Sequence, residues 1–147
     1  MLPEFNENGD LPVGIHPATL SEVVDRFGKG SAQRLIVADR LERIYQLAQK
    51  TGHLSQLIVF GSFVTNKPEP NDVDVVIIMN DEFVADPFSR DTRLLFDHAV
   101  SQAHFGASIF WARQFAALGD PKTFVEDWQI KRDGGRRGIV EIIPEAT

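Results

Sequence analysis

The octapeptide DVDVVIIM at residues 72–79 limits the folds that this chain can adopt. Its five consecutive apolar residues lack the alternation of a strand with one wet face, so they predict a strand that is covered on both faces. A second apolar run at residues 57–60 precedes it, separated by a loop that contains Pro68 and Pro70. Prolines exclude regular pairing within that loop. Because no helical crossover fits between the two runs, we expect neighbouring strands of one sheet.

Helices are predicted on both sides of this pair of strands. A capping box from Thr19 to Glu22 begins a short helix that ends at Gly28, and Ser31 caps a longer helix to about residue 50. Residues 89–104 have helical periodicity, and Asp120 is placed to cap a further short helix.

Two more strands and a lead-in complete the predicted domain. Residues 107–111 and 138–143 read as strands, the latter with the alternation of an edge strand. Residues 1–18 lack periodicity and predict an extended lead-in on the surface. We therefore expect one α+β domain over residues 1–147, with a small mixed sheet backed by helices on one face.

The composition excludes several classes of protein. The chain has 147 residues, of which 43% are hydrophobic and 24% charged, as expected of one globular domain. It has no cysteine, which excludes disulfides and thiolate metal sites. A formal net charge of -6 argues against a broadly basic surface for nucleic acid. Without a signal peptide or an apolar run of membrane-spanning length, we expect a cytoplasmic protein that does not contact a membrane.

Two acidic residues open the central strand. Successive side chains of a strand point to opposite faces, so Asp72 and Asp74 share one face while Val73 points to the other. Two carboxylates held this close repel each other strongly where water is partly excluded. A divalent cation offsets such repulsion, so the pair predicts a metal site.

The chain combines a Gly-Ser turn after one strand with Asp-x-Asp at the start of the next strand, about ten residues later. Gly61, Ser62, Asp72 and Asp74 supply this arrangement here. It resembles the signature of the nucleotidyltransferase superfamily, which includes DNA polymerase beta and the small bacterial minimal nucleotidyltransferases. The order of helices before the motif and the tail at residues 128–142 are similar to small bacterial members of that group. The resemblance implies a nucleotidyltransferase-like fold.

The resemblance also implies a reaction. Gly61 and Ser62 would hold the outer phosphates of a nucleoside triphosphate. Asp72 and Asp74 would hold a pair of divalent ions, Mg²⁺ or Mn²⁺, which bridge the triphosphate and the attacking hydroxyl. The enzyme would move a nucleoside monophosphate onto an acceptor hydroxyl, which a protein, an RNA or a small molecule could supply.

One part of the superfamily pattern is missing. A third carboxylate normally comes from a neighbouring strand, which by order along the chain should be residues 107–111. Ser108 stands there in place of an acid, and Glu141 is the alternative from another strand. Three outcomes stay open: Glu141 substitutes as a catalytic residue, the acceptor is activated weakly, or the site binds nucleotide without turnover.

Two sets of basic residues are weaker candidates. Lys67, in the loop between the two halves of the motif, could reach a phosphate or simply be solvated. A basic turn at residues 131–137 could contact a triphosphate, an RNA or an acidic partner, although we favour a hairpin-like turn with exposed charge. The four histidines share no spacing typical of metal ligands.

Three functions therefore compete. The first is a magnesium-dependent nucleotidyltransferase. The second is a protein of the same fold that does not turn over a substrate and acts as a regulatory or toxin-antitoxin protein, with a partner protein or as a homodimer. The missing third acid is the reason to consider it. The third is a sugar transferase that uses Asp-x-Asp to hold a nucleotide-sugar; it ranks last because the chain is short for the sheet such enzymes need.

Overall fold

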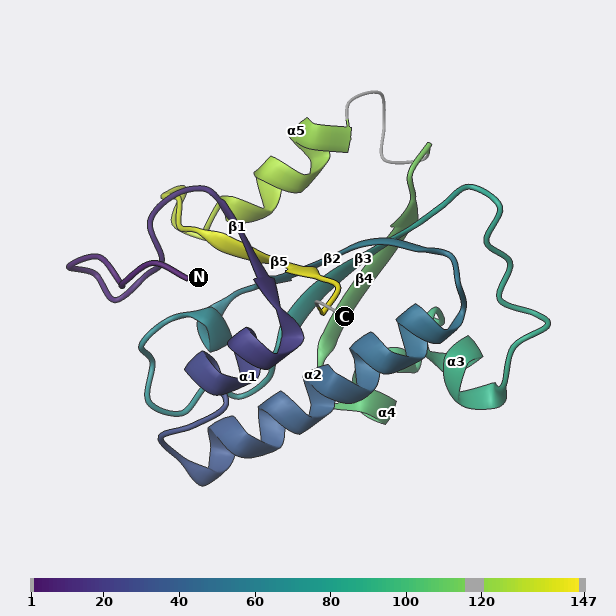
Figure 1. Ribbon diagram of the computed structural model, residues 1–147, viewed down its shortest axis with the longest axis horizontal. Helices are drawn as coiled ribbons and strands as arrows, with labels where there is room; N and C mark the ends of the chain where they lie inside the picture. Colours follow the sequence, from purple (N-terminus) through teal and green to yellow (C-terminus); the bar gives the residue numbers. More distant parts are fainter. Residues whose placement is uncertain (1, 116–120, 146–147) are drawn as a thin grey trace.

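A five-stranded mixed sheet forms the centre of the protein (Figure 1). The computed structural model describes residues 2–115 and 121–145. The strands lie in the order β1-β5-β2-β3-β4. Their bounds are β1 (Ile15–Thr19), β2 (Leu54–Phe60), β3 (Asp74–Met79), β4 (Ser108–Arg113) and β5 (Ile139–Ile143).

The strand directions make the sheet mixed. β2 runs antiparallel to both of its neighbours, β3 and β5, whereas β1 is parallel to β5 and β4 is parallel to β3. The predicted small α+β domain with a mixed sheet is thereby confirmed.

The first two helices begin where their caps predict. At Thr19 the hydroxyl accepts the amide hydrogen of Glu22, and the Glu22 carboxylate accepts that of Thr19. Ser31 caps the long helix. Within the two described ranges, no helix is long and apolar enough to cross a membrane. The helices are α1 (Leu20–Phe27), α2 (Ala32–Lys50), α3 (Arg90–Leu95), α4 (Ser101–Phe105) and α5 (Pro121–Glu126), with 3-10 turns η1 (Ser62–Val64) and η2 (Asp127–Gln129).

Both faces of the sheet are covered. Leu41 and Ile44 of α2 belong to one buried cluster with Val75 and Ile77 of β3. Val76 of β3 belongs to the other buried cluster, which includes residues of α5 and η2. The apolar run of β3 is therefore buried on both sides, as its sequence predicts. The expectation of helices on one face is wrong for α5, which lies across the sheet from α1 and α2 (Figure 1).

The N-terminal segment is not a surface lead-in. Residues 15–19 form β1, and Leu11 ahead of them is fully buried. β1 rather than β5 is the edge strand, and Pro17 within it fits an edge position, where no ladder hydrogen bond is lost. Local periodicity does not predict this strand because its pairing partner lies at the far end of the chain.

The predicted helix at residues 89–104 is divided into α3 and α4. Between them the Asp97 side chain accepts the backbone amide hydrogen of Ala99 at 3.0 Å. Such a local bond gives the backbone an alternative to the helical ladder. Asp120, the predicted cap of α5, lies outside the described residues.

Candidate functional site

The acid pair lies at the start of β3, between β2 and β4. Asp74 is the first residue of β3, and Asp72 comes two residues before it. Both line a cavity of about 630 Å³, which Ser62 and Lys67 also line. The structure thus brings together both halves of the sequence motif and the loop lysine between them.

Gly61 lies against the acid pair. Its φ of 82° falls in the left-handed region that favours glycine. A Cβ atom at this position would lie 1.9 Å from Asp74 Oδ2, which is far inside any allowed contact. The turn after β2 can therefore approach the carboxylate only because residue 61 has no side chain.

A buried arginine holds the loop that follows this turn. The Arg34 guanidinium is 6% exposed and donates to four backbone carbonyls: Phe27 (3.0 Å), Phe63 (2.9 Å), Thr65 (2.7 Å) and Lys67. Burial lowers the pKa of Arg34. Three of the four carbonyls belong to residues 63–67, so this cation of α2 fixes the loop between Gly61 and the acid pair. Sequence reasoning missed it, because an arginine on a helix is usually solvated.

The surroundings of Asp74 act on its pKa. Burial, and then the negative charge of Asp72, raise the pKa of Asp74 to about 6. The Ser108 hydroxyl and the positive charges of Arg137 and Arg132 act in the opposite direction. Ionisation of both carboxylates therefore costs free energy at neutral pH, and positive charge beside them lowers that cost.

Ser108 occupies the position where the superfamily pattern would have an acid. It lies directly opposite Asp74 in the register of β3 and β4. Its Oγ donates to Asp72 Oδ2 at 3.1 Å. The neighbouring strand thus supplies a hydroxyl to the acid pair, not a third carboxylate.

Glu141 lies away from the pair. Glu141 belongs to β5 and pairs with Ile58 of β2, and β2 separates β5 from β3. Phe60, two residues further along β2, is the residue that faces Asp74. Glu141 does not line the cavity that holds Asp72 and Asp74. The structure therefore does not bring this tentative third carboxylate to the site.

The basic turn reaches the site. A bridge between Ile130 and Arg136 closes it, as expected of a hairpin-like turn. Its charge is not simply exposed, however, because three of its cations line the cavity of the acid pair: Lys131, Arg132 and Arg137. Sequence reasoning underrated these residues, since only the fold brings them near.

Asp10 holds two of these cations in place. Its side chain lies 3.5 Å from Lys131 Nζ and 3.6 Å from Arg137 Nη1, and it is 9% exposed. A buried carboxylate from the N-terminal segment thus orients the basic turn toward the acid pair.

The donors suit a metal ion that arrives with a polyphosphate. Among residues 2–115 and 121–145, no cluster of three or more His, Cys, Asp or Glu side chains is placed to hold a metal. The site offers two carboxylates and the Ser108 hydroxyl. Mg²⁺ is commonly bound by one or two carboxylates together with substrate phosphates and water. The residues fit such an ion, and Asp72 and Asp74 would be its protein ligands.

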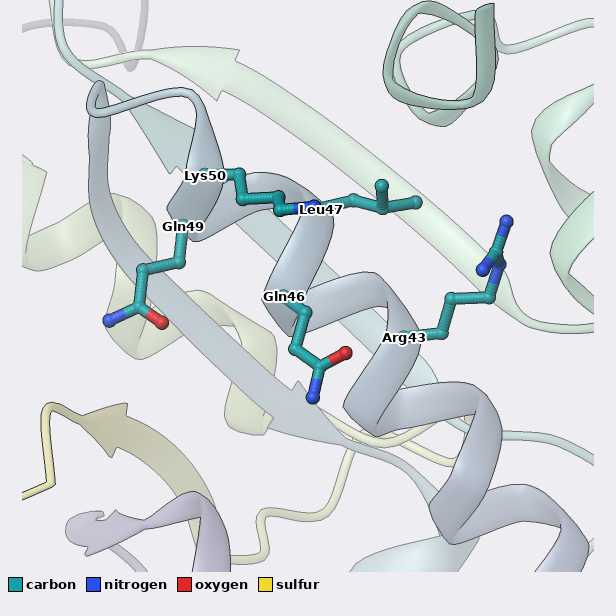
Figure 2. Close-up of a pocket in the computed structure, with 5 residues that line it drawn as sticks. All are labelled: Arg43, Gln46, Leu47, Gln49 and Lys50. Atoms are coloured by element: carbon teal, nitrogen blue, oxygen red, sulfur yellow. The ribbon is translucent and has the colours of Figure 1, made fainter. Parts of the chain in front are cut away.

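Another cavity, of about 330 Å³, has no comparable chemistry. Figure 2 shows its five lining side chains, which all project from α2 and include no acid. They are Arg43, Gln46, Leu47, Gln49 and Lys50. By contrast, the loops and strands that surround the acid pair come from separate parts of the chain.

Comparison with known proteins places the chain in a family without assigning a function. No curated protein and no solved structure matches it. One family matches almost the whole chain, over residues 3–143. The protein therefore belongs to DUF6932, which is described as a family of unknown function.

Proposed function

We propose that this protein is a magnesium-dependent nucleotidyltransferase, which moves a nucleoside monophosphate from a nucleoside triphosphate to an acceptor hydroxyl. One observation carries the proposal. Asp72 and Asp74 share a cavity with Ser62 of the Gly-Ser turn and with the cations of the basic turn. Paired acids for metal ions beside fixed cations for phosphates are the groups that phosphoryl transfer requires.

Each group has a role in this proposal. Ser62 and the backbone at Gly61 bind the outer phosphates, and Lys67 with the basic turn neutralises their charge. Asp72 and Asp74 hold Mg²⁺ or Mn²⁺. Such ions, when bound, stabilise the charge that develops at the reacting phosphate and on the pyrophosphate that leaves. Nucleoside triphosphates are cytoplasmic metabolites, which supports a cytoplasmic protein.

Space for an acceptor adjoins the acid pair. A cavity of about 640 Å³ shares Asn71, Asp72 and Gln102 with the cavity of the acid pair and extends along α4. An acceptor hydroxyl that entered from this side would meet Asp72 directly. A protein side chain, an RNA end or a small molecule could each supply it.

A second candidate is a protein of the same fold that binds nucleotide without turning it over, and acts with a partner protein. The hydroxyl of Ser108 beside Asp74 favours it. A serine hydroxyl is no base near neutral pH, so activation of the acceptor would depend on the two remaining acids. For the enzyme, we therefore expect slow transfer.

Binding and transfer can be measured separately on the full chain. Calorimetry and thermal shift with Mg²⁺ and each of the four nucleoside triphosphates should show binding that D72N/D74N abolishes. The matched control is D39N, which removes an exposed acid of α2. Transfer is followed with α-labelled triphosphates and cell extract.

The outcomes separate the candidates. Label that moves to protein, RNA or a small molecule supports the enzyme. Binding without transfer supports the partner protein, and turnover of a UDP- or GDP-sugar supports the sugar transferase. If no triphosphate binds in the presence of Mg²⁺, both nucleotide proposals fail.

A further inference from the structure

An aromatic cleft, defined by Phe60, Phe110 and Trp128, adjoins the acid pair. These three rings line a cavity of about 220 Å³, which Gly61 and Asp74 also line. From the sequence, core packing is a sufficient reason for aromatic residues at these positions. The structure adds that they lie beside the residues proposed to bind a triphosphate.

The rings form a connected surface. The Trp128 centroid is 4.9 Å from that of Phe60 and 5.2 Å from that of Phe110. Phe60 and Phe110 are 6.3 Å apart. Phe110 is 44% exposed, so part of its ring remains available for contact with a ligand.

Strand register explains why aromatic and acidic side chains share one face. Phe60 pairs with Asp74 across β2 and β3, and Asp74 pairs with Ser108 across β3 and β4. Phe110 is two residues beyond Ser108 and therefore points to the same face. Trp128, in η2, packs over this face. The local sequence of any one strand does not reveal this arrangement.

Charge completes the arrangement. The aromatic cleft is also lined by Lys131, Arg132 and Arg137, which line the cavity of the acid pair as well. The continuous site therefore has a planar apolar end, a cationic middle and a pair of acids. A ligand that matches it has a flat ring at one end and a polyanion at the other.

We propose that the aromatic cleft is a nucleobase subsite, in which the base of a nucleoside triphosphate stacks on Phe110 while its phosphates run between the basic turn and the acid pair. This inference rests on the proposed function. Base stacking on an aromatic side chain tolerates all four bases, because every base has a π-face. The subsite therefore binds the base with little selectivity between A, G, C and U.

Affinity measurements test the subsite against the phosphate site. The full chain is titrated with Mg²⁺ and either ATP or inorganic tripolyphosphate, which lacks base and sugar. F110A should weaken ATP binding by about fivefold to a hundredfold, the range measured for loss of one stacking partner, and leave tripolyphosphate binding unchanged. F110W retains a stacking surface and should restore ATP affinity. F115A, at an 89% exposed phenylalanine outside both cavities, is the matched control.

A second readout reports on the cleft without a substitution in it. The chain has two tryptophans, so 5-fluorotryptophan labelling gives two fluorine resonances. Trp111 packs on the opposite face of the sheet, with its ring 5.1 Å from that of Phe96, and W111F assigns its resonance. ATP with Mg²⁺ should shift the Trp128 resonance and leave that of Trp111 in place.

Failure of this inference can be told from failure of the proposed function. Equal affinity for ATP and tripolyphosphate, with no effect of F110A, overturns the nucleobase subsite and leaves the phosphate site intact. An F110A protein that changes its oligomeric state but not its ATP affinity also overturns it, and identifies the cleft as a protein contact. If neither ligand binds, the proposed function fails and the subsite fails with it.

Discussion

Gly61 and Asp74 lie so close that a single added carbon at residue 61 would meet Asp74 Oδ2 at 1.9 Å. β2 ends one residue before Gly61 and β3 begins at Asp74, so the turn after β2 lies directly against the acid pair. Any polyphosphate held by the turn would therefore lie within reach of the carboxylates.

Gly61→Ala tests this contact. The new methyl group forces the Asp74 carboxylate to move and strains a backbone with φ near 82°, so we expect a loss of about 2–4 kcal/mol in the free energy of unfolding. Gly52→Ala is the matched control, because Gly52 has a φ of 74° and a Cβ added there would meet no atom within 4 Å. Chemical denaturation should show a clearly smaller loss for the control; equal losses would argue against the steric contact.

Asp74→Asn should change how stability depends on pH. The pKa of Asp74 is raised to about 6 in the folded protein, above the ordinary value of 3.8 for this side chain. Protonated Asp74 therefore favours folding at low pH, and this contribution is lost as pH rises through about 6. Asparagine stays neutral, so the variant should be more stable than the wild type at pH 8, by on the order of 2 kcal/mol, and the advantage should fade between pH 6 and pH 4.

Denaturation in the absence of divalent ions, at several pH values, measures this difference. Asp39→Asn provides the control for loss of an exposed acid. An advantage for Asp74→Asn that is the same at pH 4 and pH 8 would contradict the raised pKa.

Arg34→Lys should loosen the loop after Gly61. Lysine has three donors on one nitrogen and cannot reach four carbonyls as the planar guanidinium does. We expect a loss of about 2–4 kcal/mol in the free energy of unfolding, because buried carbonyls are left without donors. Hydrogen exchange should speed up at the Val64 and Thr65 amides, which close this turn. Arg43→Lys, at a half-exposed ion pair of the same helix, should change neither quantity much.

If the proposed function holds, Arg137→Gln should weaken triphosphate binding. Arg137 lines the cavity of the acid pair, and one lost hydrogen bond to a charged group corresponds to about a tenfold rise in Kd or more. Arg136→Gln removes the neighbouring charge of the same turn, outside the cavity, and should have little effect. Titration with ATP and Mg²⁺ compares the two variants, and a similar loss in both would reduce the role of Arg137 to general electrostatic attraction.

Ser108→Asp adds the third acid that the superfamily pattern has and this chain lacks. Three neighbouring carboxylates repel one another, so the melting temperature of this variant should fall in the absence of divalent ions. It should recover when Mg²⁺ is added. If the proposed function holds, label transfer should become faster than in the wild type. Ser108→Asn matches the new side chain in size without its charge. A variant that neither regains stability with Mg²⁺ nor changes transfer would argue against a metal at Asp72 and Asp74.

Local order along the chain accounts for several secondary-structure elements of this protein. The capping box at Thr19, the doubly buried run of β3 and the close pairing of β2 with β3 follow from the order of neighbouring residues. Asp72 and Asp74 lie together because alternate residues of an extended segment point the same way, although β3 itself begins only at Asp74. The resemblance to nucleotidyltransferases, together with the order of elements, predicts Ser108 on the strand beside Asp74, and the two residues pair directly.

The surroundings of that pair depend on contacts between segments that are distant in the chain. β5 is inserted between β1 and β2, which places Glu141 away from the acids and carries the basic turn toward them. Asp10 then fixes Lys131, although the two lie 121 positions apart in the chain. Strand order and contacts of this kind depend on pairing between distant segments, and the periodicity of each segment is the same whichever partner it pairs with.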